Sequence, residues 1–147
     1  MRHSPSLRRR RCSSFELVVA LAVMLKGRQT LLEVSSLGPQ AAPTFLQIAK
    51  VYERLDRPTD ALAALLAARR AAPAEPLVLS ELARLYELQG RSEELAEVLT
   101  AWLAANPDEP ERLALHLRLA ALAEEHLKRD DEAIAHYRAV LEHTPGH

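Results

Sequence analysis

Few residues of this sequence suit disulfides, cysteine-based metal sites, phosphate-binding loops or β-sheets. Among the 147 residues there are four glycines and a single cysteine, Cys12. One cysteine excludes a disulfide within the chain and a zinc site built from thiolates. Four scattered glycines cannot form a glycine-rich phosphate loop. Valine and isoleucine together number only ten, which argues against a β-sandwich or a Rossmann-type sheet.

Alanine and leucine, by contrast, supply 25 and 27 residues of the chain. Both are strong helix formers, so the composition predicts an all-α protein. Hydrophobic residues make up 48% and charged residues 27%, values that are typical of a folded globular domain rather than of a disordered one. The formal net charge of −1 favours neither an acidic nor a basic partner.

Positive charge is concentrated at the start of the sequence. Residues 1–14 contain five arginines and no acid, whereas the remaining residues carry 14 bases against 20 acids. We expect residues 1–14 to form a disordered basic tail. Cys12 lies alone in this tail with no ordered base beside it in the sequence, so we expect a free thiol rather than a nucleophile.

Residues 15–41 follow as a predicted N-terminal helical segment, either a degenerate half-repeat or a signal-like sequence. The apolar run Leu17–Leu25 covers nine residues, whereas a membrane-spanning helix needs about 20. Charged residues on both sides of the run weaken the signal-peptide interpretation. We expect a cytoplasmic protein, or a secreted or periplasmic one if residues 1–36 act as a signal peptide. The sequence leaves open whether Met1 or Met24 is the true start.

Four prolines divide the rest of the sequence at regular intervals. Pro39, Pro73 and Pro107 are 34 residues apart, and Pro145 follows after 38. Because proline ends a helix at or before the preceding residue, this spacing predicts a repeating helical unit. The predicted repeat domain covers residues 42–147, and its units are 42–75, 76–109 and 110–145.

Each of the first two units contains two apolar helix faces separated by a turn, and the apolar residues recur at helical spacing. In the first unit the faces are Phe45, Ile48, Ala49 and Tyr52, then Ala61, Leu65 and Ala68; in the second they are Leu79, Leu82, Ala83 and Tyr86, then Leu95, Leu99 and Trp102. The turns are predicted around Pro58 and at Gly90. Thr59 and Ser92 are the predicted N-caps of the second helices.

This pattern resembles the tetratricopeptide repeat, a 34-residue helix–turn–helix unit with large, large, small and aromatic residues on its first helix. Residues 42–75 fit at every position, whereas Leu95 and Trp102 stand where the second unit would usually have small residues. The third unit fits in its second helix, and its first helix aligns through Leu119-Ala120 only with an insertion. The resemblance implies an all-α, right-handed α-solenoid of antiparallel helix pairs, with about three repeats plus the N-terminal helical segment. We expect Trp102 to pack against alanines of the third unit.

The resemblance also implies a function, since in this family the first helices of the repeats line a concave groove that binds peptides. The implied groove positions are Leu46, Lys50, Glu53 and Arg54 in the first unit and Ser80, Arg84, Glu87 and Leu88 in the second. The leucines suit a partly apolar partner segment, such as a helix laid into the groove. The Lys and Asn clamp of chaperone-binding members is absent, because the only asparagine, Asn106, falls in a predicted loop.

The last predicted helix, at residues 131–143, carries an apolar face with no following repeat to cover it. Ile134, Tyr137 and Leu141 make up this face. Repeat arrays normally end in a helix with a polar outer face. The face therefore packs on another protein or on a second copy of the chain, giving a homo-oligomer, or the chain is part of a longer array.

No constellation of residues predicts catalysis, a cofactor or a metal site. Five of the six histidines lie late in the sequence, without the i, i+4 spacing of a zinc-binding helix. These are His116, His126, His136, His143 and His147. We expect them to be separate, solvated side chains and expect no metal among them.

The sequence therefore predicts a non-catalytic scaffold or adaptor for protein–protein interaction. One alternative is a nucleic-acid-binding helical repeat that uses the basic N-terminal arm. Against it, residues 76–109 carry two bases and seven acids. The other alternative is a fragment or accessory part of a longer multidomain protein.

Overall fold

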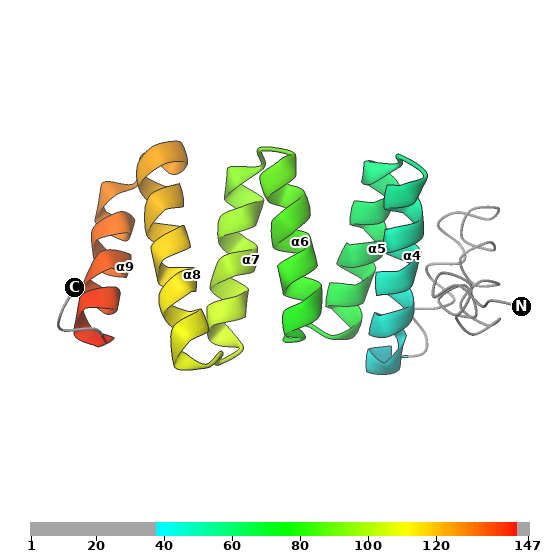
Figure 1. Cartoon of the computed structure of the whole chain (residues 1–147), viewed down its shortest axis with the longest axis horizontal. Helices are drawn as coiled ribbons and strands as arrows, with labels where there is room; N and C mark the ends of the chain where they lie inside the picture. The colour runs from blue at the N-terminus through cyan, green and yellow to red at the C-terminus, as the bar shows by residue number, and fades with distance from the viewer. Residues whose placement is uncertain (1–37, 144–147) are drawn as a thin grey trace, which may run out of the picture. The chain divides into compact units, whose positions relative to one another are not determined.

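The structure, a computed structural model, describes residues 38–143, and over this range the chain forms helices and turns without a β-strand (Figure 1). The prediction of an all-α fold is confirmed. The predictions for the basic tail, Cys12 and the Leu17–Leu25 run lie outside the described residues, as do those for Pro145 and His147. The elements are η1 (Gly38–Ala41), α4 (Ala42–Arg54), α5 (Pro58–Ala71), α6 (Pro76–Leu88), α7 (Ser92–Ala104), α8 (Glu109–Leu122), η2 (Ala123–Leu127) and α9 (Asp130–His143).

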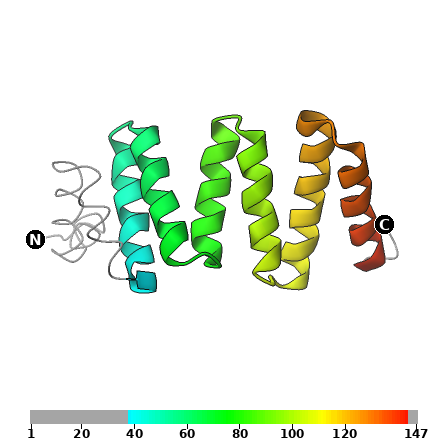
Figure 2. The same cartoon turned by 180° about the vertical axis from the view of Figure 1, so that it is seen from behind.

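These elements belong to two compact units whose boundary lies between Pro73 and Ala74. The first unit contains η1 and the helix pair α4 and α5. The second contains α6, α7, α8, η2 and α9. Within the second unit, Figures 1 and 2 show from opposite sides the same four helices side by side in chain order. Each helix packs against its neighbour in sequence there, so the unit is built from successive helical hairpins.

The core of the first unit includes all the residues that the repeat pattern places on the inner helix faces. All seven are at most 3% exposed: Phe45, Ile48, Ala49, Tyr52, Ala61, Leu65 and Ala68. The alanines let α4 and α5 approach closely, and the large side chains fill the space between them. Each large side chain contributes about 1.5–3 kcal/mol through its burial.

The second unit buries the equivalent residues of α6 and α7 together with one face of α8. Leu79, Leu82 and Leu99 are almost completely buried, and Leu115 and Ala120 of α8 join them. These helices therefore share one apolar core, because no single hairpin can cover both of its faces.

Trp102 on α7 is only half-buried, although the sequence placed it in the core. Its indole Nε1 is nevertheless buried and finds no hydrogen-bond partner among the described residues. A buried donor without a partner is unfavourable. The fold therefore accommodates Trp102 at a position where a repeat usually has a small residue, but the indole N–H loses its hydrogen bond to water.

Several helices begin with a proline in their first two positions, and both predicted N-caps are wrong because their residues lie inside the helices. Helix α5 starts at Pro58, which places Thr59 inside the helix, and α7 starts at Ser92 itself. The residues before these helices, Arg57 and Arg91, make no side-chain capping bond. Proline at the first position needs no cap for its own nitrogen, because it has no N–H. Helix α8 does have a side-chain cap, since Asp108 accepts a hydrogen bond from the backbone N–H of Glu111 at 3.0 Å.

The first helix of each repeat ends on a residue in the left-handed backbone conformation. These residues are Asp56, Gly90 and Lys128, with φ between 55° and 67°. In each case the next residue is an arginine whose backbone N–H donates to a carbonyl of the preceding helix. The acceptors are Tyr52 for Arg57 (2.9 Å), Tyr86 for Arg91 (2.9 Å) and Ala123 for Arg129 (2.8 Å). This bond stops the first helix and turns the chain into the second.

The side chain of this arginine reinforces the turn. Arg57 lies over the Tyr52 ring at 5.3 Å and pairs with Asp60 at 2.7 Å. Thirty-four residues later, Arg91 lies over Tyr86 at 5.1 Å and pairs with Glu94 at 2.7 Å. Such cation–π contacts at exposed positions contribute about 0.5–1 kcal/mol each.

The third repeat keeps only the ion pair. Arg129, 38 residues after Arg91, lies 3.8 Å from Glu132. Ala123, whose carbonyl accepts the Arg129 N–H, stands where the earlier repeats have the tyrosine, so the aromatic ring is not repeated here. The spacings between these arginines, 34 and 38 residues, equal those between the prolines that end the helices. The arginine turns therefore repeat with the same period as the helix ends.

The extra length of the third repeat is divided between a longer α8 and a π-helical turn. From Leu82 to Arg91 the chain advances nine residues, whereas from the matching Leu119 to Arg129 it advances ten. The structure absorbs this additional residue in η2, whose five residues form a π-helix. A single π turn inside or at the end of an α-helix is the usual result of a one-residue insertion and is frequent at functional sites.

The left-handed turn residues make a direct prediction for stability. Gly90→Ala should destabilise the fold by about 1 kcal/mol, since an alanine at φ +67° is strained although no atom lies within 4 Å of its added Cβ. Lys128→Gly should stabilise by a similar amount, because it relieves the same strain in the third repeat. Chemical denaturation of both variants measures the two changes. Equal effects of the same sign would contradict this account of the turns.

Candidate functional site

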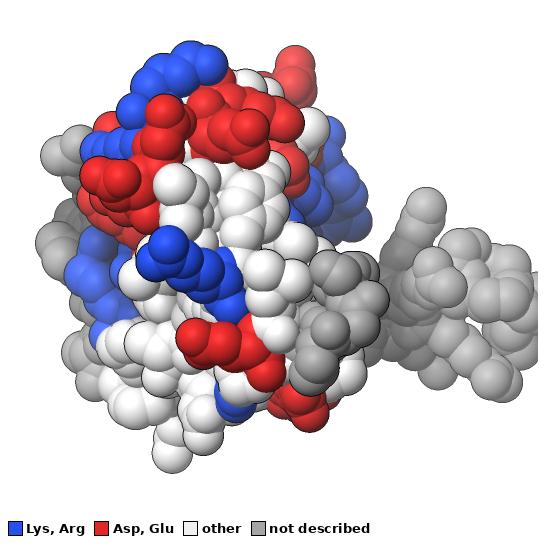
Figure 3. All heavy atoms as spheres, turned by 90° about the vertical axis from the view of Figure 1, so that its left-hand side faces the viewer, with Lys and Arg blue, Asp and Glu red and all other residues white. Residues whose placement is uncertain are grey.

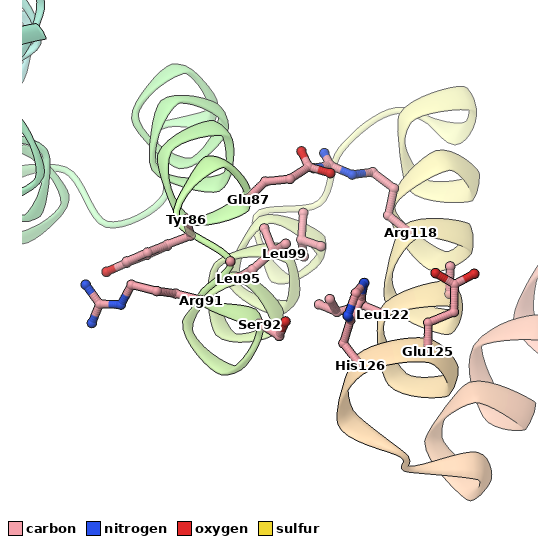
Figure 4. A pocket seen from close by; sticks show the side chains of 12 residues that line it. Tyr86, Glu87, Arg91, Ser92, Leu95, Leu99, Arg118, Leu122, Glu125 and His126 are labelled. Carbon is pink, nitrogen blue, oxygen red and sulfur yellow. The ribbon is translucent and has the colours of Figure 1, made fainter. Parts of the chain in front are cut away.

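A pocket of about 280 Å³ opens in the second unit between the α6–α7 turn and the end of α8 (Figure 4). Its apolar wall is made by Leu95 and Leu99 of α7 and by Leu122 of α8, all of them buried. Ala121 adds a small side chain between them. These are core residues of the repeat, so the fold itself fixes the position of this wall.

The rim of the pocket is polar and carries both signs of charge. Glu87 on α6 and Arg118 on α8 point toward one another, with 3.4 Å between the carboxylate and the guanidinium (Figure 4). Glu125 and His126 of η2 and Arg91 of the α6–α7 turn line the rest. The Glu87–Arg118 pair is solvent-exposed and therefore contributes little to stability. Its charges remain accessible to polar groups of a bound molecule.

The π-helical turn η2 supplies Glu125 and His126 to the rim of the pocket. Two contacts hold η2 and the following turn in place. The Tyr137 hydroxyl on α9 donates to Glu124 at 3.1 Å, and Arg129 pairs with both carboxylate oxygens of Glu93 on α7 at 2.8 and 3.0 Å. The one-residue insertion in the third repeat is therefore what brings Glu125 and His126 to the pocket.

The size and lining of the pocket suit one or two amino-acid side chains. Sites for drug-sized ligands and cofactors occupy about 300–1,000 Å³ and enclose most of the ligand, whereas this pocket is smaller and open. An apolar floor with charged groups at its edge is typical of the place where a protein partner anchors an apolar side chain.

The groove positions predicted for the first unit all lie on α4 but differ in accessibility. Leu46 is 7% exposed and belongs to the core. Lys50 and Arg54 are exposed, and Glu53 is half-buried. The accessible surface at these positions is therefore charged, and its role in binding stays a prediction.

Of the four positions predicted on α6, one lines the pocket. That residue is Glu87. Leu88 beside it is 73% exposed. Ser80 is half-buried, and its hydroxyl donates to the Leu77 carbonyl at 2.8 Å. Arg84 pairs with Glu81 at 2.8 Å. Groove binding by these residues also stays a prediction.

The sequence did not reveal the residues that α8 and η2 contribute to the pocket. The groove positions were predicted on the first helices of the first two units only, so Arg118, Leu122 and Glu125 were not among them. The only signal for them was the irregular length of the third unit, which indicates an altered helix but not where its side chains point.

The apolar face predicted at the last helix lies on α9. Ile134, Tyr137 and Leu141 are 47%, 38% and 51% exposed. Figure 3 looks onto the α9 end, where uncharged side chains occupy much of the middle and lower surface and acidic side chains gather above them. These three residues stand one or two helical turns apart and so share one side of the helix.

Two of the predicted histidines, His116 on α8 and His136 on α9, are not the separate, solvated side chains that the sequence predicted. His116 and His136 are both half-buried, and their Nδ1 atoms lie 3.0 Å apart. Burial lowers the pKa of both imidazoles. The prediction was wrong because it compared histidines along one helix, whereas this pair forms between two helices.

The comparison with known protein families agrees with the repeat pattern. The sequence model of the tetratricopeptide repeat matches residues 46–110. Residues 46–110 are tetratricopeptide repeats. This segment contains most of α4, all of α5, α6 and α7, and the turn residues Asp56 and Gly90.

Solved structures of two tetratricopeptide-repeat proteins resemble this chain. The crystal structure of MamA has a TM-score of 0.55 at 16% identity, over 99% of this chain and 78% of MamA. The Pseudomonas aeruginosa protein PilF has a TM-score of 0.51 at 20% identity, over 90% of this chain and 62% of PilF. At these identities the likeness concerns the fold alone. No curated protein matches this chain in sequence.

Tetratricopeptide repeats generally mediate protein–protein interaction, and the family is typically a non-catalytic scaffold fold. Proteins with these repeats bind other proteins. None of the helices between Gly38 and His143 has the length and apolar character that crossing a bilayer requires.

The hydrogen bond between Tyr137 and Glu124, which holds η2 in place, predicts how Tyr137 titrates at alkaline pH. The hydrogen bond to Glu124 raises the pKa of Tyr137 above its ordinary value of 10.0, since the carboxylate disfavours the phenolate. The contact therefore stabilises the fold below pH 10 and is lost as the pH rises through the raised pKa. Ultraviolet titration of the wild type minus Tyr137→Phe isolates this tyrosine. Glu124→Gln should return its midpoint toward 10; an unchanged midpoint would contradict the placement of η2.

Proposed function

We propose that this chain is a non-catalytic adaptor that binds a segment of another protein, and that the pocket beside η2 receives one apolar side chain of that segment. The observation that supports this most directly is a pocket wall lined by leucines, next to an accessible rim that carries both positive and negative side chains. Hot spots of protein interfaces have this composition, because a buried anchor supplies affinity while the polar rim selects the partner.

The predicted groove fits the same function. Glu87 belongs both to the groove positions on α6 and to the pocket rim. Leu88, the next residue, exposes 73% of its surface. A partner segment lying along α6 would contact Leu88 with one apolar residue and place another in the pocket. An amphipathic helix offers apolar residues at such spacing on one side.

The charges at the rim indicate which segments are favoured. Arg118 pairs with Glu87 and Arg91 pairs with Glu94, whereas Glu125 has no ion-pair partner among the salt bridges between described residues. The rim is therefore slightly acidic, and it favours a partner segment in which a basic residue stands next to the apolar anchor.

Filling the pocket tests this proposal without removing any core contact. A peptide is first selected from a random displayed library on the purified chain, and its affinity is measured by fluorescence anisotropy. Ala121→Phe should weaken binding about 10- to 100-fold, since the phenylalanine occupies the space of an anchor whose burial is worth about 1.5–3 kcal/mol. The expected selected sequences carry an apolar residue beside a basic one.

Ala63→Phe is the matched control, because Ala63 is exposed on α5 in the other unit. It should leave the affinity unchanged. Circular dichroism and thermal unfolding verify that both variants are folded. Equal affinities of Ala121→Phe and the wild type for every selected peptide would refute the pocket as the binding site.

The exposed face of α9 supports a second contact of the same adaptor, with another copy of the chain. Ile134, Tyr137 and Leu141 form an apolar stripe on one side of the helix. Because a two-fold interface brings the same patch of both subunits together, an apolar stripe is complementary to itself. We therefore propose that α9 pairs with α9 of a second copy.

Light scattering over a concentration series measures this association. The wild type should exceed the monomer mass of 16.4 kDa at high concentration, and replacement of the three residues by glutamine should keep it at that mass. Leu55→Gln with Leu77→Gln is the control, since both leucines are exposed elsewhere. A wild type that stays monomeric, or a triple variant that associates equally, would contradict the pairing.

A further inference from the structure

Two imidazoles meet between α8 and α9 inside the second unit. The Nδ1 atom of His116 lies 3.0 Å from the Nδ1 atom of His136. The ring centroids are 5.3 Å apart, and the ring planes are tilted by 44°. The two residues are 20 positions apart in the sequence, so the packing of the two helices alone brings them together.

A contact between two ring nitrogens of the same kind has only two favourable forms. In the first, one neutral ring donates its N–H to the lone pair of the other. In the second, both rings carry their hydrogen on Nε2, and the two Nδ1 lone pairs share a cation. Because both side chains are only half-buried, water and small ions can reach them.

The separation of the nitrogens fits a metal ion with particular geometry. With nitrogen–metal bonds of about 2.0–2.1 Å, a 3.0 Å separation corresponds to an angle of about 95° at the metal. Tetrahedral zinc prefers a wider angle, whereas neighbouring ligands in square-planar or octahedral coordination stand near 90°. Imidazole suits Ni²⁺ and Cu²⁺, which adopt these geometries.

Three charged or titratable groups surround the pair. The Glu132 carboxylate, one turn before His136 on α9, acts on His136 and favours a cation there. Arg112 on α8 and His143 on α9 act on His116 in the opposite sense. Burial lowers the pKa of both imidazoles.

We infer that His116 and His136 form a two-histidine site for a divalent transition-metal ion, with Ni²⁺ and Cu²⁺ preferred to Zn²⁺. Between Gly38 and His143 no group of three or more His, Cys, Asp or Glu side chains is arranged to hold a metal, so water completes the coordination. A bound ion would link α8 to α9. This inference does not depend on the proposed adaptor function.

Calorimetric titration of the full chain with Ni²⁺ tests the site. Every protein carries His3→Gln, Cys12→Ser and His147→Gln, because these residues near the chain ends can bind Ni²⁺ independently. The parent protein should bind one equivalent, and His116→Gln and His136→Gln should each weaken binding about tenfold or more. His126→Gln is the control, since His126 is exposed on η2, and it should bind like the parent.

Two further measurements keep the test informative if a variant folds poorly. Ni²⁺ should raise the thermal unfolding midpoint of the parent more than Zn²⁺ does, because an ion bound only by the folded state stabilises it. In NMR spectra of the parent, paramagnetic Ni²⁺ should first broaden the ring signals of His116 and His136. Unchanged binding in both variants, or broadening confined to other histidines, would overturn the inference.

Discussion

The repeats of this protein depend on how each helical hairpin is closed. A left-handed residue followed by an arginine ends the first helix at Asp56, Gly90 and Lys128. The arginine N–H caps a carbonyl of the helix it follows, and in two repeats its side chain also covers a tyrosine ring. Because this closure fixes where the second helix starts, it decides which apolar faces meet. The cores of both units follow from that choice, since each hairpin buries only the faces that its turn brings together.

The pocket arises where this regular scheme is interrupted. One additional residue between Leu119 and Arg129 cannot be placed in an α-helix without rotating every later side chain by about 100°. The π turn η2 absorbs it and keeps α9 in register with the core. Two side chains of this turn, Glu125 and His126, then line the rim of the pocket between α7 and α8.

Much of the fold could be predicted because apolar spacing and proline positions are local signals. The buried positions from Phe45 to Leu99 follow from helical periodicity, and the turn at Gly90 follows from the conformational freedom of glycine. The N-caps were predicted wrongly at Thr59 and Ser92, because helix starts depend on the whole turn. For the candidate site, the sequence yielded Glu87 but not Arg118 or Leu122, which contribute only through packing between repeats.

The sequence by itself determined the helical class, the period of the repeat and most of the apolar helix faces that form the core, because each of these depends on residues within one or two turns of each other. The tertiary structure decided which side chains from different helices meet. The Glu87–Arg118 pair, the Arg129–Glu93 pair and the contact of His116 with His136 join residues 20 to 36 positions apart. Their distances depend on helix packing and on one inserted residue, and no local pattern encodes them.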